Sequence, residues 1–420
     1  AVYFPRPGSE QVNPFLRWWG YDKVVWQRDE SLPITMGLTM NVMGYDVKFE
    51  TTFTGAGGKF TMLKEVVDLK DVVRLEKEGE ILRVKHNPSF LEKAQKEIKK
   101  QSKARFRFMS PVFRECVENL TDYVDYTVRI KETGNFLNMY GTGASAIYFG
   151  NISVSIEAKV MRLPWEWRKI EKTTGISMED LGAIIVSPTV SVMRPRRGRE
   201  IRHLGWAVRD ALRKLLNRAL VLRPLEIRSK IKENVIRPTK EKILSEDASN
   251  LCNVLHTLFL EHKGCLPERI EAAIRDIFGP DISITFELTA DGRIFMRVYE
   301  GNLPLDPPMI SDGFYKVLAI LTAIESKPSI LAIDELENSL HPEAIQRVVD
   351  ELLNAGCPVI ATTHSPAVVD IVEPEHVILV DKDEEGATVM RRVKDPEALK
   401  RTLSEKGITL SEGWLYGKII

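Results

Sequence analysis

The sequence predicts an α/β protein of two lobes, with a mainly parallel central sheet, an antiparallel β amino-terminal lobe and a helical insertion. Three observations predict it: alternating apolar and polar residues near the start, a charged helical stretch after them, and a strand-helix-strand unit near the end. The 420 residues are enough for about two or three structural units. We expect these units to span residues 1–86, 87–243 and 244–420.

The amino-terminal lobe is predicted from residues 32–84. Apolar and polar side chains alternate there between glycine turns, as in Val47, Phe49 and Thr51. A period of two is typical of strands with one buried face, so these residues predict antiparallel strands. The glycine-rich stretch from Gly55 to Lys59 lies between two such runs and is interpreted as a hairpin turn.

The middle segment is charged. Residues 87–106 favour a helix, and basic side chains crowd the chain between Arg194 and Lys242. Such a run can bind phosphate backbones by releasing counterions. It can also be the solvated face of a helix, because Leu204, Val208 and Leu212 follow helical spacing. The sequence leaves both interpretations open, so DNA is a candidate partner.

A short apolar strand is expected from Ile330 to Ile333. Its four residues are uniformly apolar, which is typical of a strand buried on both faces of a parallel sheet. Asp334 and Glu335 follow directly, so both carboxylates should emerge at the carboxyl end of this strand. Ligand sites of open α/β sheets lie at that edge.

The next residues predict a crossover helix and a second parallel strand. Pro342 suits a first helical position, and Gly356 offers a helix stop. Residues 358–363 then form an apolar strand that ends at His364. Between the two strands, a helical stripe is formed by Ile345, Val348, Val349, Leu352 and Leu353. Asp334, Glu335 and His364 should therefore converge on one edge, as a magnesium nucleotide site requires.

Four motifs occur in order in this part of the chain. They are Ile310-Ser311-Asp312-Gly313, Asp334-Glu335, Asn338-Ser339-Leu340-His341-Pro342 and the histidine of Ala361-Thr362-Thr363-His364-Ser365-Pro366. The set resembles the signature motif, Walker B pair, D-loop and switch histidine of ABC-type ATPase heads. It is most similar to the SMC, RecF and OLD-like AAA family of P-loop ATPases. The resemblance implies the two-lobed fold of those heads.

The resemblance also implies roles, with ATP and Mg²⁺ as cofactors. Asp334 would bind the metal, Glu335 would position the attacking water, and His364 would sense the phosphate. Ser311, Asp312 and Gly313 would engage ATP held by the other subunit of a homodimer, because a helix start is an anion site. Asn338 and Ser339 would cross the dimer interface.

One part of such a site is missing from the sequence. No GxxxxGK[ST] phosphate-binding loop, or Walker A, occurs in the 420 residues. Gly55 to Lys59 imitates it, but Phe60 stands in place of Ser or Thr and Phe53 in place of the first Gly. The stretch from Gly141 to Ser145 lacks the lysine. We expect the loop upstream of Ala1 or on another polypeptide, and the ATPase activity is conditional on it.

The resemblance predicts an ATP-gated dimerising switch in DNA repair, chromosome maintenance or defence. One alternative is the ATPase subunit of an OLD-like nuclease system with the nuclease on a partner protein, because residues 376–393 are predicted to form a hairpin rather than a nuclease site. Another is a non-hydrolysing scaffold that retains the fold. The four cysteines show no metal-ligand spacing. No membrane span or secretory signal is predicted, and we expect a cytoplasmic protein.

Overall fold

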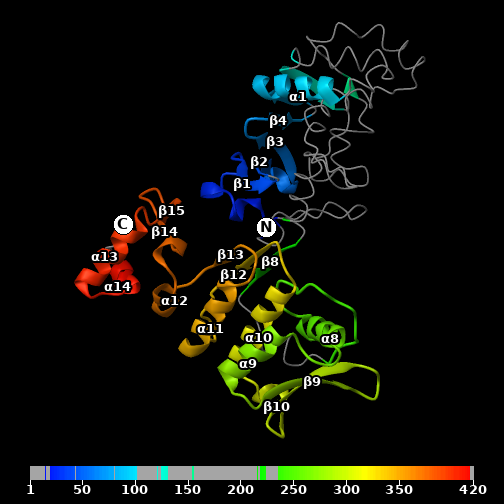
Figure 1. The fold of residues 1–420 in the computed structure, drawn as a ribbon, viewed down its shortest axis with the longest axis vertical. Coiled ribbons are helices and arrows are strands. Elements are labelled where there is room, and N and C mark those ends of the chain that lie inside the picture. The colour runs from blue at the N-terminus through cyan, green and yellow to red at the C-terminus, as the bar shows by residue number, and fades with distance from the viewer. Residues whose placement is uncertain are drawn as a thin grey trace. The chain divides into compact units, whose positions relative to one another are not determined.

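The computed structural model describes residues 15, 19–42, 44–79, 81–101, 121, 124–130, 154–155, 215, 218–223 and 235–416. The chain divides into two compact units, Ala1–Lys214 and Leu215–Ile420 (Figure 1). The expected three-part division at residues 86 and 243 stays a prediction.

The first unit contains an antiparallel sheet. Among the described residues it has seven strands, which neighbour one another in sequence order. They are β1 (Ile34–Val42), β2 (Tyr45–Thr54), β3 (Thr61–Leu69), β4 (Val73–Glu78), β5 (Ile81–His86), β6 (Asp125–Ile130) and β7 (Val154–Ser155). The antiparallel strands predicted from the alternating residues 32–84 are confirmed.

One face of this sheet is buried in cross-strand rows. Val47 of β2 pairs with Leu69 of β3, which pairs with Val73 of β4, which pairs with His86 of β5. All four side chains are buried. Burial lowers the pKa of His86 to about 4, because a charged imidazole would lose its hydration there. His86 is therefore a neutral core residue at physiological pH.

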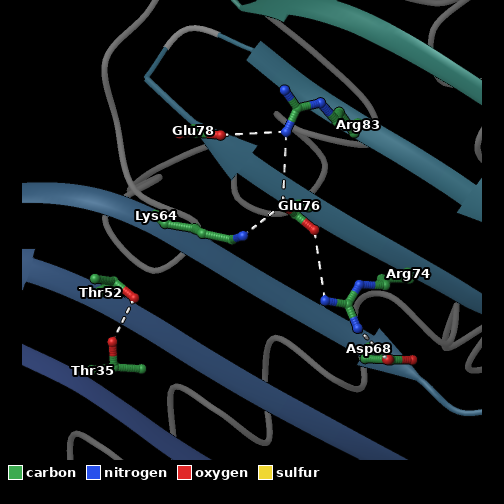
Figure 2. Close-up of polar contacts among 8 residues, drawn as sticks. All are labelled: Thr35, Thr52, Lys64, Asp68, Arg74, Glu76, Glu78 and Arg83. Carbon is green, nitrogen blue, oxygen red and sulfur yellow. Dashed lines mark hydrogen bonds and ion pairs between the residues drawn. The ribbon is translucent and has the colours of Figure 1, made fainter.

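The other face of the sheet is polar and charged (Figure 2). The carboxylate of Glu76 on β4 forms ion pairs with three basic side chains. The N···O distances are 2.7 Å to Lys64, 3.6 Å to Arg74 and 3.7 Å to Arg83. The hydrogen bond from Lys64 contributes most to lowering the pKa of Glu76. The cations of these pairs are exposed to solvent and Glu76 is partly so, and each pair therefore contributes little to stability.

The glycine-rich stretch lies in the connection between β2 and β3, as predicted. A 3₁₀ turn, η4 (Ala56–Gly58), forms there, and the backbone N–H of Gly57 donates to the Glu30 carboxylate at 3.1 Å. Phe53 and Phe60 pack together with ring centroids 5.5 Å apart. The residues that depart from the phosphate-loop pattern therefore belong to a small aromatic core.

Helix α1 (Pro88–Gln101) confirms the helix expected over residues 87–106 as far as the structure describes it. Residues 102–106 lie outside the described part, as do Gly141 to Ser145 and most of the basic segment between Arg194 and Lys242. Besides η4, the described residues form the short 3₁₀ helices η2 (Tyr21–Lys23), η3 (Trp26–Arg28), η7 (Pro307–Met309) and η8 (Pro374–His376).

The second unit contains the parallel sheet. Its described strands are β8 (Ala219–Leu222), β12 (Ile330–Ile333) and β13 (Val359–Ala361), in the order β13-β12-β8. Both pairings are parallel, with Leu331 opposite Val359 and Leu220. Helix α11 (Pro342–Leu353) connects β12 to β13. The predicted strand, crossover helix and parallel strand are thus confirmed, and β12 is flanked on both sides.

Two details of the crossover differ from the prediction. Leu353 was placed on the buried stripe, but its side chain is 56% exposed, whereas Ile345, Val348, Val349 and Leu352 are buried. The helix ends there, with Asn354 as its C-cap, so Leu353 turns away from the core. The following strand spans only Val359–Ala361, shorter than residues 358–363.

Helix α10 (Asp312–Glu325) lies almost entirely inside the core of the second unit. Every residue from Phe314 to Ile324 is buried, including Lys316 and Thr322. The core around it includes α8 (Leu251–Glu261), α9 (Glu268–Phe278), and an antiparallel sheet of β9 (Ile282–Leu288), β10 (Ile294–Glu300) and β11 (Leu303–Leu305). The sequence did not predict this second sheet.

The last part of the described chain forms α12 (Pro366–Ile371), β14 (Ile378–Lys382), β15 (Thr388–Arg392), α13 (Pro396–Lys406) and α14 (Leu410–Leu415). Strands β14 and β15 pair antiparallel, which confirms the hairpin predicted over residues 376–393. In the part of the chain that is described, no helix has both the length and the apolar character needed to cross a bilayer.

Candidate functional site

The predicted site lies at the carboxyl end of β12, where hydrogen bonds from both flanking strands continue past the last strand residue. The backbone N–H of Asp334 donates to the Leu222 oxygen at 3.0 Å, and the N–H of Thr362 donates to the Ile333 oxygen at 2.9 Å. The main chain is therefore held from both sides where the two carboxylates begin. The side chains of Asp334 and Glu335 are exposed, so a ligand can reach them.

Thr362 fixes the two acidic residues relative to each other. Its hydroxyl donates to Oδ1 of Asp334 at 2.6 Å and accepts from the backbone N–H of Glu335 at 2.9 Å. One side chain from the end of β13 thus orients the carboxylate of Asp334 and the main chain of Glu335. The sequence analysis did not identify Thr362, although it lies between a predicted strand and His364.

Glu335 starts a tight turn in a left-handed conformation. Its φ is +51°, and that of Ser339 is +62°. This region costs a residue with a side chain on the order of 1 kcal/mol or more. The turn is closed by the Asn338 N–H, which donates to the Glu335 oxygen at 3.1 Å. Surrounding contacts must therefore hold the turn that carries Glu335, Asn338 and Ser339.

Lys316 of helix α10 supplies one such contact. Its side chain is 4% exposed, and Nζ donates to the backbone oxygen of Glu335 at 2.5 Å. Burial lowers the pKa of Lys316 to about 8, against the opposing influence of the Glu337, Glu335 and Asp334 carboxylates. The sequence analysis missed Lys316. A lysine inside the apolar run that follows Gly313 was the available signal.

Glu337 connects this turn to the next strand end. Its Oε1 accepts the backbone N–H of His364 at 2.7 Å. Burial alone would raise the pKa of Glu337, but the N–H groups of His364 and Glu337 itself and the hydroxyl of Thr363 lower it overall. Glu337 is therefore a carboxylate that holds the backbone of His364 beside the turn. This third acid was also missed, because nothing in its spacing distinguishes it from a surface residue.

The signature-like motif lies at the start of α10, as predicted. Ser311 is the N-cap of the helix, and its Oγ accepts the N–H of Phe314 at 3.2 Å. Gly313 lies against the turn after β12: a Cβ added to it would be 2.5 Å from the backbone oxygen of Ser339. Glycine is required there for the close approach of two backbones rather than for an unusual φ.

The structure thus brings the predicted residues into one region of the second unit. Asp334 and Glu335 are joined through Thr362, the turn of Asn338 and Ser339 touches Gly313, and His364 is tied to the turn by Glu337. The catalytic and binding roles assigned to these residues stay predictions.

The donor set decides which kind of metal would fit. Among the described residues, no group of three or more His, Cys, Asp or Glu side chains could enclose a metal ion. Magnesium is commonly bound by one or two carboxylates together with substrate phosphates and water. The exposed carboxylate of Asp334, with one oxygen held by Thr362, fits a magnesium ion that arrives with a nucleotide.

The basic segment contributes little to the described site. Arg223 lies 3.5 Å from Glu246, and Lys242 lies 2.7 Å from Glu261. These basic residues are therefore partly neutralised by acids of the same unit. The other basic residues of that segment, apart from Arg218, Arg237 and Lys240, lie outside the described part of the chain.

Acidic residues after a central parallel strand, beside a helix start, form the kind of edge at which α/β proteins bind phosphate-bearing ligands. Residues 162–370 match the family described as "AAA domain, putative AbiEii toxin, Type IV TA system". The match covers just under half of the chain and includes every predicted site residue. It supports an AAA-type ATPase at a coarse level. A search of curated proteins finds no match.

Solved structures similar to this chain include SMC ATPase heads. One comes from work on ATP-driven dimerization and DNA-stimulated activation of SMC ATPases (15% identity, TM-score 0.28, 35% of this chain and 95% of that chain). Another is an Smc head bound to the C-winged helix domain of ScpA (11%, 0.31, 65% and 70%). A third, from Pyrococcus furiosus, is an Smc head with an extended coiled coil bound to the C-terminal domain of ScpA (9%, 0.29, 86% and 80%).

Proposed function

We propose that this chain is an ATP-hydrolysing subunit that works as an ATP-gated dimerising switch. The observation that supports it most is the pair Asp334 and Glu335 at the end of the central parallel strand, held by Thr362 and placed beside the start of α10. Hydrolysis of a phosphoanhydride needs a metal-binding carboxylate and a group that orients water. Both are present as exposed side chains on a fixed main chain.

Each acid has a separate role in this proposal. Asp334 holds Mg²⁺, which neutralises charge on the phosphates when it is bound. Glu335 orients the attacking water and accepts its proton. His364 lies at the end of the neighbouring strand, where its backbone is tied to Glu337. A change in the terminal phosphate can therefore be passed from His364 to the turn that carries Glu335.

The dimer follows from the start of α10. The first turn of a helix leaves backbone N–H groups without intrahelical acceptors, and the helix dipole favours an anion there. Ser311, Asp312 and Gly313 form this end of a 14-residue helix. In the proposal they bind the γ-phosphate of ATP held by a second copy of the chain, and Asn338 and Ser339 lie at the contact between the two copies.

The proposed site needs a phosphate-binding loop, which the 420 residues do not contain. Strand β13 pairs with β12 on one side, and among the described strands it has no partner on the other. Ile360 in its middle is 59% exposed. An open edge of a parallel sheet can accept a further strand. We place the strand that leads into the phosphate loop at this edge, from the same polypeptide or a separate one.

DNA repair, chromosome maintenance and defence can each use an ATP-gated dimer, with DNA and an effector or nuclease protein as partners. The matched family's description names a toxin of a type IV TA system. Among the three pathways, this favours defence.

The dimer is tested by sedimentation of the protein together with its phosphate-loop segment. Glu335→Gln keeps the shape of the side chain but removes its basicity, so ATP and Mg²⁺ should accumulate a dimer that dissociates slowly. Glu343→Gln is the matched control, because Glu343 is exposed on the first turn of α11. Adding Ser311→Arg to Glu335→Gln should abolish the dimer. A monomer under all of these conditions would overturn the proposal.

A further inference from the structure

We propose that Lys316 is a positioning residue that links the start of α10 to Glu335, and that it holds the Glu335 main chain in the conformation needed for hydrolysis. The inference deepens the proposed ATPase function and rests on it for the catalytic role of Glu335. The link itself is a property of the folded chain and can be tested without nucleotide.

The geometry supports a direct connection. Lys316 lies three residues after Gly313 on the same helix, within one turn of the proposed phosphate-binding end. Its Nζ donates to the backbone oxygen of Glu335 at 2.5 Å, while Gly313 touches the backbone of Ser339. Helix α10 therefore contacts both ends of the turn. A shift of the helix start, when it binds or releases an anion, must move Glu335 or break these contacts.

The conformation of Glu335 explains why such a contact is needed. With φ at +51°, Glu335 would relax toward a commoner backbone conformation if nothing opposed it. A charge-assisted hydrogen bond is about twice as strong as a neutral one, and here it ends on the strained residue itself. Glu335 is exposed, so its carboxylate can contact a ligand. Its backbone oxygen meanwhile accepts the hydrogen bond from the buried Lys316.

A purely space-filling role does not account for a lysine at this position. Its neighbours Val317, Leu318 and Ala319 are fully buried apolar residues, and an aliphatic side chain would fill the same core without desolvating an ammonium group. The carboxylates of Glu337, Glu335 and Asp334, which lie in the proposed site, also attract the ammonium group of Lys316 and raise its pKa against the effect of burial. The positive charge thus balances this acidic cluster from inside the fold.

This arrangement predicts opposite effects on cation binding and on turnover. Lys316→Met replaces lysine by another long, unbranched side chain, which carries no charge. The acidic cluster then attracts a divalent cation more strongly, so Mn²⁺ should bind roughly three- to tenfold more tightly. Hydrolysis should become slower, because Glu335 is no longer held. A residue needed only for folding would weaken both properties together.

The first test is hydrogen exchange of the full chain without ligand. Lys316→Met should raise exchange of the amides of residues 335–340 by roughly tenfold, with α10 and β12 unchanged. Thr322→Val is the matched control, because Thr322 is fully buried on the same helix and its hydroxyl donates only to Leu318. Unchanged exchange in residues 335–340, or an equal increase throughout the second unit, would overturn the inference.

The second test separates this inference from the proposed function. Mn²⁺ binding is measured by electron paramagnetic resonance for the wild type, Lys316→Met and Asp334→Asn. If Asp334→Asn abolishes Mn²⁺ binding and Lys316→Met tightens it, the results support both the metal site at Asp334 and the role of Lys316. If Lys316→Met weakens Mn²⁺ binding, the role proposed for Lys316 is wrong, but the metal site at Asp334 is still supported. If Asp334→Asn binds as the wild type does, the metal site is wrong, and the exchange result decides the role of Lys316.

Discussion

Gly313→Ala should destabilise the second unit through a single added methyl group. The new Cβ would lie 2.5 Å from the Ser339 oxygen, 0.9 Å short of the 3.4 Å at which ordinary contact begins. The atom it meets is backbone, which cannot rotate away. The turn from Glu335 to Leu340 must therefore move, or the first turn of α10 must.

The magnitude follows from two opposing effects. Alanine is favoured over glycine inside a helix by about 1 kcal/mol, whereas forcing an extra methyl group into a filled space costs about 1–3 kcal/mol. We expect a net loss in the free energy of unfolding of about 1 kcal/mol. The turn that carries Asn338 and Ser339 should also become more mobile. Nucleotide-dependent dimerisation should then weaken more than stability does.

The assay is urea unfolding followed by hydrogen exchange, so that each unit is observed separately. Gly37→Ala is the control, because its Cβ would lie 3.5 Å from the Phe49 oxygen, in ordinary contact. That control should leave the second unit unchanged. A Gly313→Ala protein that is more stable than the wild type, as helix propensity alone predicts, would show that the close approach to Ser339 does not require glycine.

Two further predictions concern Thr362 and His86. Thr362→Val removes the hydroxyl that is hydrogen-bonded to Asp334 and Glu335, so the affinity for Mn²⁺ should fall roughly tenfold. Circular dichroism should show that the sheet is intact. An unchanged affinity would show that the hydroxyl does not orient Asp334. His86 has a folded pKa of about 4, below its ordinary value of 6.5. The unfolded chain therefore takes up the proton first, and the free energy of unfolding of the first unit should fall by about 3 kcal/mol as pH drops from 6.5 to 4. Urea titrations across this range should show a shallower fall for His86→Leu, and parallel curves would argue against a buried neutral imidazole.

The sequence predicted those parts of the fold that leave a periodic pattern. Alternation placed the antiparallel strands of the first unit, and the apolar run before Asp334 placed the central parallel strand. The error at Leu353 has a local cause, since periodicity does not show where a helix ends. The sheet of β9, β10 and β11 was missed because its residues are mostly half-buried or exposed.

The site was only half predictable for a different reason. Motif order pointed to Asp334, Glu335 and His364, and the structure places them on neighbouring strand ends. The residues that hold them act across long sequence separations: Lys316 reaches Glu335, 19 residues away, and Thr362 reaches Asp334, 28 residues away. Such contacts join residues that are far apart in the sequence and close only in the folded chain. They follow no spacing rule along the chain.

We propose that Glu335 activates water at a magnesium nucleotide site. The most direct measurement compares ATP turnover by the wild type, Glu335→Gln and the Glu343→Gln control, each with the phosphate-loop segment present. Glu335→Gln should slow turnover by roughly 100-fold or more while ATP still binds, and Glu343→Gln should turn over as the wild type does. Equal turnover in all three proteins would contradict it.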